Sequence, residues 1–168
     1  MKQVMIAISS FFLAAPVWAI DPLQALKQDA KQEPIFCSAG SCYRLANNAI
    51  LVPKSDGLSG VANLGELGVK VMPSGASRSM DSTAVAMDEN SGRPVIVTRM
   101  VHVFAGSREL GELWANESKG KVYAHSNTLG MTSVLFSTPQ EAVTAVHNNK
   151  NKEIQAEVEV IRDIPKAN

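Results

Sequence analysis

The three histidines are the first residues in this 168-residue chain whose chemistry could support a site: His102, His125 and His147. No two of them have the i, i+4 spacing that lets a helix present a pair of metal ligands, and none lies next to a cysteine. His147 ends a helical pattern, where the helix dipole favours a protonated imidazole. The sequence therefore predicts no metal site, and we expect no cofactor.

Arg99 and His102 interrupt an otherwise apolar stretch, Pro94–Ala105. The stretch reads as a central strand that is covered on both faces, and alternation places these two side chains on opposite faces. In a structural interpretation, Arg99 meets a carboxylate or lies near a sheet edge, and His102 is hydrogen-bonded. In a functional interpretation, one face opens on a cleft where Arg99 or His102 contacts a ligand.

Catalytic motifs are few. The chain has no Gly-x-Ser-x-Gly nucleophile elbow and no glycine-rich nucleotide-binding loop. A hydrolase would have to use His102 or His125 together with an acid that the fold brings close. We therefore predict no catalytic residue from the sequence alone.

Cys37 and Cys42 are the only cysteines and are separated by four residues. In an oxidising compartment this spacing predicts a disulfide. A redox pair would favour the Cys-x-x-Cys spacing, and a zinc site would need further ligands nearby. The closed loop is short, so the bond removes only about 2 kcal/mol of unfolded-state entropy.

The first nineteen residues are typical of a secretory leader. Lys2 precedes the apolar segment Val4–Ala15, and Pro16–Ala19 ends with the small residues of a cleavage site. A buried N-terminal helix is the alternative. We expect cleavage before Ile20 and a periplasmic or secreted mature chain, and no later segment reaches the roughly 20 apolar residues that span a bilayer.

Residues 20–168 suit one domain of ordinary size. Lys2 is the only charged residue of the leader. The mature chain therefore keeps all 16 acidic residues and has one basic residue fewer than the 16 of the full chain. This balance, without a block of like charge, argues against nucleic acid or an anionic membrane as the main partner.

Two helices are predicted by their first residues. Asp21-Pro22 can cap and open a helix that ends before Pro34, and Thr138-Pro139-Gln140-Glu141 forms a capping box. Gly106–Lys119 stays ambiguous, because Leu110, Leu113 and Trp114 have helical spacing but Gly111 weakens a helix.

The remaining apolar runs alternate as strands, with a turn at Asn47-Asn48 and a hairpin loop at 88–92. In the last run, 154–160, an apolar face alternates with an acidic face that we expect to be exposed. Together these elements predict a single α+β domain: a mainly antiparallel sheet of five to seven short strands, with a helix near each end of the mature chain. The predicted strands lie in 43–52, 68–72, 83–87, 94–105, 122–125, 131–136 and 154–160.

These features favour a non-enzymatic exported protein that binds another exported or envelope protein. It would serve an envelope, secretion or conjugation assembly, or inhibit an exported enzyme. The surface we expect to bind comprises Ser74–Ser82, Cys37–Cys42 and Arg108–Trp114. Trp114 would anchor an interface if exposed and would otherwise belong to the core. The alternative is a small periplasmic hydrolase or ligand-binding domain that uses His102 or His125.

Overall fold

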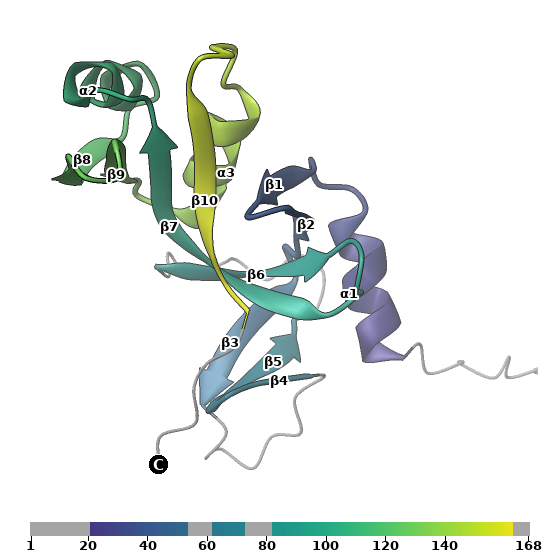
Figure 1. Ribbon diagram of the computed structural model, residues 1–168. Coiled ribbons are helices and arrows are strands. Elements are labelled where there is room, and N and C mark those ends of the chain that lie inside the picture. Colours follow the sequence, from purple (N-terminus) through teal and green to yellow (C-terminus); the bar gives the residue numbers. More distant parts are fainter. Residues whose placement is uncertain (1–20, 54–61, 73–81, 163–168) are drawn as a thin grey trace, which may run out of the picture.

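Strand β7 (Pro94–Phe104) is the longest element of the described residues and organises the fold (Figure 1). The computed structural model describes residues 21–53, 62–72 and 82–162. On one edge, β7 pairs with β6 (Thr83–Asp88) over its first half and with β9 (Met131–Leu135) over its second half. On the other edge it pairs with β10 (Gln155–Ile161).

These strands belong to a seven-stranded antiparallel sheet with the order β1-β2-β6-β7-β9-β8, to which β10 adds beside β7. The remaining members are β1 (Phe36–Ser38), β2 (Ser41–Leu45) and β8 (Lys121–Ser126). The sheet is curled, and helices pack on it, so the predicted α+β class and antiparallel pairing are confirmed.

The structure also contains a second, three-stranded sheet, whereas the sequence pattern predicted only one sheet. It has the order β3-β5-β4, with β3 at Ala49–Pro53, β4 at Ala62–Leu64 and β5 at Leu67–Val71. The run that alternates through 43–52 is therefore two strands that belong to different sheets. The chain leaves the main sheet at the Asn47-Asn48 turn.

The helices α1 (Pro22–Ala30) and α3 (Pro139–His147) begin at the caps that the sequence predicts. The Asp21 carboxylate accepts a hydrogen bond from the Leu23 N–H at 3.0 Å. The Thr138 hydroxyl accepts from the Glu141 N–H at 3.2 Å, and the Glu141 carboxylate accepts from the Ser137 N–H. Local hydrogen bonds thus define both starts.

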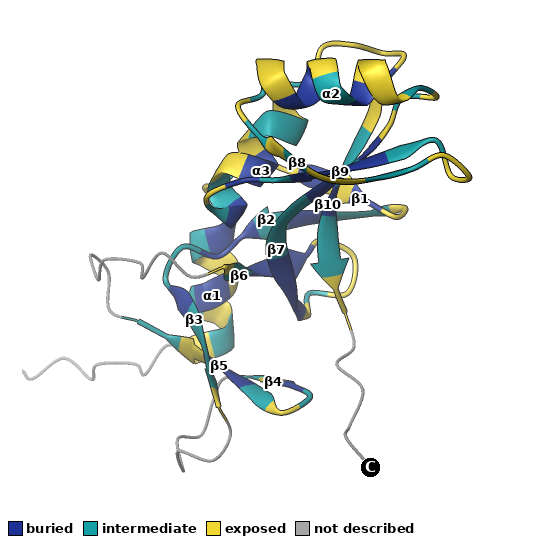
Figure 2. Cartoon of the chain, turned by 90° about the vertical axis from the view of Figure 1, so that its left-hand side faces the viewer, coloured by how far each residue is buried: buried dark blue, intermediate teal, exposed yellow. Residues whose placement is uncertain are grey.

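The ambiguous segment forms a third helix, α2 (Arg108–Glu117), which lies against β8 and β9 (Figure 2). Its Gly111 touches Thr132 so closely that a Cβ atom there would lie 2.1 Å from the Thr132 Oγ1 atom. The absence of a side chain at Gly111 therefore allows α2 to lie close to the sheet. This packing requirement outweighs the cost of glycine in a helix.

The two faces of β7 meet different cores. Val95, Val97, Val101 and Val103 pack with α2 and α3, whereas Ile96 packs with α1 and the second sheet. The expectation that β7 is covered on both faces is correct for its first half and wrong for its second half, where side chains between the core valines are half-buried or exposed (Figure 2). No described element covers that part of the sheet.

Candidate functional site

The uncovered part of the main sheet is the candidate site. Met100, His102 and Phe104 of β7 are paired with Leu135, Ser133 and Met131 of β9, so all six share one face. We define the open face as these six side chains together with Tyr123. Phe104 is 36% exposed, and α2 and α3 cover the opposite side of the same strands.

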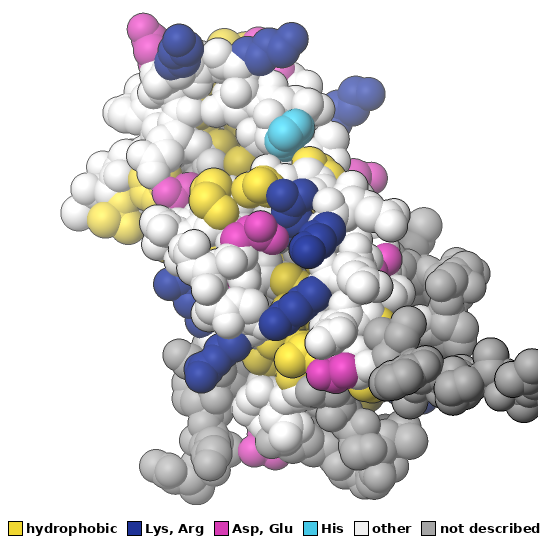
Figure 3. Space-filling view, turned by 90° about the vertical axis from the view of Figure 1, so that its right-hand side faces the viewer, with side chains coloured by type: hydrophobic (Ala, Val, Ile, Leu, Met, Phe, Trp, Pro, Cys, Tyr) yellow, Lys and Arg dark blue, Asp and Glu magenta, His cyan; other side chains and the backbone are white. Residues whose placement is uncertain are grey.

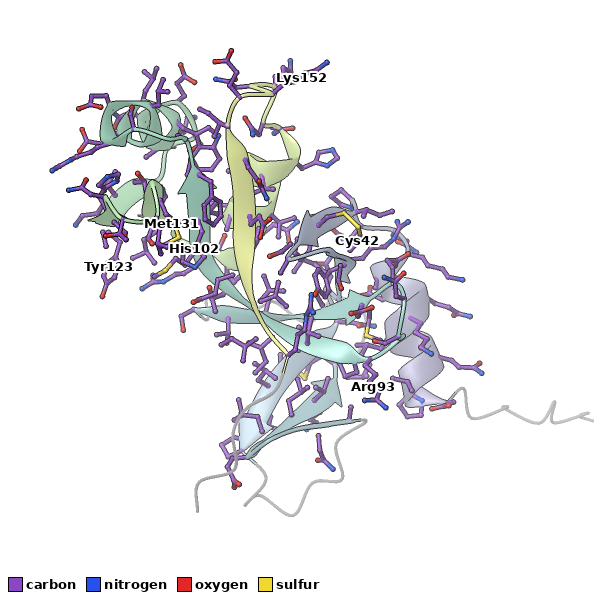
Figure 4. All side chains as sticks on the ribbon, viewed as in Figure 1. Cys42, Arg93, His102, Tyr123, Met131 and Lys152 are labelled. Carbon is purple, nitrogen blue, oxygen red and sulfur yellow. A yellow bond between two sulfur atoms is a disulfide. The ribbon has the colours of Figure 1, made fainter. Side chains whose placement is uncertain are left out.

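Tyr123 joins the open face through an irregularity in β8. The pairing of β8 with β9 shifts between Val122 and Ala124, which leaves Tyr123 as an extra residue, 69% exposed. Figure 4 shows Tyr123, Met131 and His102 on the side of β8 and β9 away from α2. Leu129, in the turn beyond β8, is 64% exposed. Bulges of this kind redirect side chains and are common beside functional sites.

A line of polar groups crosses the open face from three strands. The His102 Nδ1 atom lies 3.2 Å from the Ser133 hydroxyl, and its Nε2 atom lies 3.9 Å from the Glu159 carboxylate. Glu159 also accepts a hydrogen bond of 2.7 Å from the Thr98 hydroxyl. A second register shift, between Val158 and Val160, accompanies Glu159. The fold thus holds His102 between a hydroxyl and a carboxylate.

These residue types could support nucleophilic catalysis, but the geometry is incomplete. Ser133 is only 7% exposed and lies within β9, which pairs with β7 on one side and β8 on the other. The backbone N–H groups around it point along the sheet, so they do not form an oxyanion hole above its face. The 3.9 Å separation of His102 and Glu159 also exceeds a hydrogen bond.

The structure does not bring His125 to His102. The His125 Nδ1 atom lies 2.9 Å from the Thr132 hydroxyl, which is buried on the face under α2. The side chains of the two histidines therefore lie on opposite faces of the sheet. His102 lies beside Glu159, and His125 is close enough to Glu109 of α2 to interact with it electrostatically.

Arg99 is half-buried where the pairing of β7 changes from β6 to β9. Its carbonyl accepts a hydrogen bond from the Phe136 N–H, and it makes no ion pair with a described residue.

Trp114 is not an exposed anchor. It is 5% exposed and meets Phe136 edge to face, with ring centroids 6.2 Å apart. The core alternative for Trp114 is therefore correct. The exposed hydrophobic residues of its helix are Leu110 and Leu113 instead.

The predicted disulfide between Cys37 and Cys42 is present and joins paired positions of β1 and β2. Strand β10 and Arg162, which follows it, hold this hairpin. The Glu157 carboxylate accepts from the Ala39 N–H at 3.0 Å, and the Arg162 side chain donates to the Tyr43 hydroxyl at 2.7 Å. The expected exposed acidic face of β10 is therefore wrong in part, because Glu157 and Glu159 are half-buried and hydrogen-bonded.

The site residues that sequence reasoning missed are Phe104, Tyr123, Met131, Ser133 and Glu159. Alternation along 131–135 already places Met131 and Ser133 on one face, so this signal was available. The two register shifts that accompany Tyr123 and Glu159 depend on the partner strand and leave no local signal.

Charge is mixed elsewhere on the surface. The side of the molecule that carries α1 shows basic side chains with acidic ones beside them (Figure 3). There, Arg44 lies 3.1 Å from Glu89 and donates to the carbonyls of Lys31 and Glu33. This basic side chain is therefore already committed to contacts within the fold.

Asp88, at the end of β6, shows the clearest electrostatic effect. A hydrogen bond from the Ser91 N–H holds the pKa of Asp88 below its usual value, against the opposing effect of burial, and the Asn90 N–H adds to the lowering. The ionised carboxylate thereby fixes the loop between β6 and β7.

The described residues contain no cluster of three or more His, Cys, Asp or Glu side chains arranged to hold a metal ion. They also contain no helix with the length and apolar character to span a membrane. The predicted leader and the binding loop Ser74–Ser82, apart from Ser82, lie outside the described residues.

One formal motif has a local explanation. Ser118 and Lys121 have Ser-x-x-Lys spacing, but the Ser118 hydroxyl donates to the Trp114 carbonyl at 2.7 Å at the end of α2. This hydroxyl therefore stabilises the C-terminal end of α2.

No protein-family model matches the chain, and no curated protein or solved structure is significantly similar to it.

Proposed function

We propose that this chain is an exported, non-enzymatic binding or accessory protein that holds a second protein on the open face. The observation that supports this proposal is the uncovered half of β7 and β9, where Phe104 and Tyr123 expose aromatic surface beside Met131. Exposed apolar side chains that gather on one face of a sheet mark interaction sites.

The composition of the open face favours a protein over other partners. Its apolar side chains lie on both sides of the His102–Ser133 pair, with Phe104 and Met131 toward one end and Met100 and Leu135 toward the other. Protein interfaces are enriched in Tyr, Phe and Met and also contain hydrogen-bonding groups. The face has no cluster of basic side chains of the kind that phosphate groups require.

The proposed location outside the cytoplasm is supported by the leader pattern of residues 1–19 and by the disulfide between Cys37 and Cys42. Disulfides persist in oxidising compartments such as the periplasm. The partner would then be another exported or envelope protein, either a component of an assembly or an enzyme that this chain inhibits.

The test is capture of proteins from an envelope extract by the tagged chain, followed by mass spectrometry. Tyr123→Ser and Phe104→Ser remove aromatic contacts from the open face. Leu113→Ser is the matched control, since Leu113 is equally apolar and exposed but lies on α2. We expect a stoichiometric partner to bind the unchanged chain and Leu113→Ser, and to be lost from the other two variants. A partner that all three variants retain would contradict binding at the open face.

A hydrolase is the second candidate, because His102 lies between Ser133 and Glu159. A fluorophosphonate probe labels a serine that a histidine activates. Labelling that is lost in both Ser133→Ala and His102→Ala would establish this activity. From the missing oxyanion donors we expect no labelling of the unchanged chain.

A further inference from the structure

A groove lies on the helix-covered side of the main sheet, away from the open face. It runs between the C-terminal turn of α2 and the length of α3, with a volume of about 1060 Å³. Trp114 and Phe136, packed edge to face and only 5% and 4% exposed, present a narrow apolar strip at its base. The groove is large for a small-molecule site, so it can hold a ligand of several linked units.

The walls of the groove are polar but carry no net charge. Two carboxylates, Glu117 and Glu141, are balanced by the ammonium groups of Lys119 and Lys150. Side-chain amides and hydroxyls supply most of the remaining lining, including those of Asn148, Ser118 and Thr144. Such a lining offers hydrogen-bond donors and acceptors in similar measure, and it attracts neither a cation nor an anion.

Some of these groups are available to a ligand. The side chains of Glu117 and Asn148 make no hydrogen bond or ion pair with another described residue. The hydroxyls of Ser118 and Thr144 donate to helix carbonyls, so their lone pairs stay free to accept.

One wall of the groove is fixed in place by its own contacts. The Asn149 side chain donates to the Ile154 carbonyl at 2.8 Å and accepts from the Asn151 N–H at 3.2 Å. A wall that is already ordered costs little entropy when a ligand binds.

We propose that this groove binds a neutral oligosaccharide. A sugar chain carries many hydroxyl donors and acceptors and no charge, which matches walls that are rich in hydrogen-bonding groups and have no net charge. Its apolar C–H groups can meet the narrow apolar strip at the base. A peptide strand would instead need an unpaired strand edge, and a peptide helix would need a continuous apolar row. The walls are α2, α3 and the loop that follows α3, and the apolar lining is confined to Trp114, Phe136 and Ala145.

Tryptophan fluorescence provides a direct readout. Trp18 and Trp114 are the only tryptophans, so Trp18→Phe in the full chain leaves Trp114 as the sole emitter. The probes are three neutral trisaccharides, maltotriose, cellotriose and triacetylchitotriose, with trialanine as the peptide probe. We expect a saturable change in Trp114 emission with at least one trisaccharide, at a dissociation constant below about 1 mM.

Two variants locate the binding. Thr144 is exposed and lines the groove, so Thr144→Tyr should block it, whereas His147→Tyr adds the same ring to α3 at an exposed position outside the lining. We expect Thr144→Tyr to weaken binding at least about tenfold and His147→Tyr to leave it unchanged. Tyr123→Ser, on the open face, should also leave sugar binding unchanged, which separates this site from the proposed protein site.

Two results would overturn the proposal. One is the absence of any saturable change with all three trisaccharides, or a change with trialanine alone. The other is a sugar-induced change that Thr144→Tyr and His147→Tyr affect equally, because binding would then lie outside the groove.

Discussion

Replacing Gly111 by alanine tests whether α2 is pressed against the sheet as the structure shows. A Cβ atom at this position would lie 2.1 Å from the Thr132 Oγ1 atom and 2.7 Å from its Cβ atom. Both distances are below any normal carbon contact, and Thr132 is buried and cannot turn aside freely. Either α2 or β9 must therefore shift.

Two opposing effects set the magnitude. Alanine favours a helix over glycine by about 1 kcal/mol, and overpacking a tight contact costs about 1–3 kcal/mol. The steric effect should dominate at Gly111, with a net loss of up to about 2 kcal/mol in the free energy of unfolding. Since α2 forms one wall of the groove, the same change should also lower the affinity of any ligand that binds there.

Urea unfolding followed by circular dichroism measures this loss. Asn116→Ala is the matched control, because Asn116 is an exposed residue of the same helix and its replacement changes helix propensity alone. We expect Asn116→Ala to be neutral or stabilising by a few tenths of a kcal/mol. If Gly111→Ala also proved as stable as the unchanged chain, the close contact of α2 with Thr132 would be refuted.

Three further outcomes follow from the structure. Because hydrogen bonding lowers the pKa of Asp88 in the folded state, its ionised form adds stability above the ordinary carboxyl pKa, and this stability is lost as the pH falls through the lowered value. Asp88→Asn should therefore be less stable at neutral pH, and urea midpoints across the acid range should show the gap closing; a constant gap would contradict this linkage. Replacing Cys37 and Cys42 by serine should cost about 2 kcal/mol in thermal or urea unfolding, and no loss would show that the hairpin is held by other contacts. Ala39 adopts a φ of 47° before Gly40, so Ala39→Asn should stabilise the turn by about 1 kcal/mol, and a loss of stability would count against this turn geometry.

Features that depend on neighbouring residues were predictable from the sequence. The caps at Asp21 and Thr138 each join groups two or three residues apart, and both were correct. The disulfide at Cys37 and Cys42 and the hairpin of β6 and β7 also depend on short spacings. The core valines of β7 share one face, as the period-two alternation of a strand requires.

Tertiary structure decided what the sequence left open. Alternation shows which side chains share a face but not whether another element covers that face, so the open half of β7 was missed. Gly111 weakened the local helix pattern although its contact with Thr132 requires it. His102, Ser133 and Glu159 are far apart in the chain and meet only because β9 and β10 pair with opposite edges of β7. Hydrogen-bond caps and alternation act over a few residues, whereas strand register and coverage arise from packing between distant segments, and these long-range contacts create both the open face and the groove.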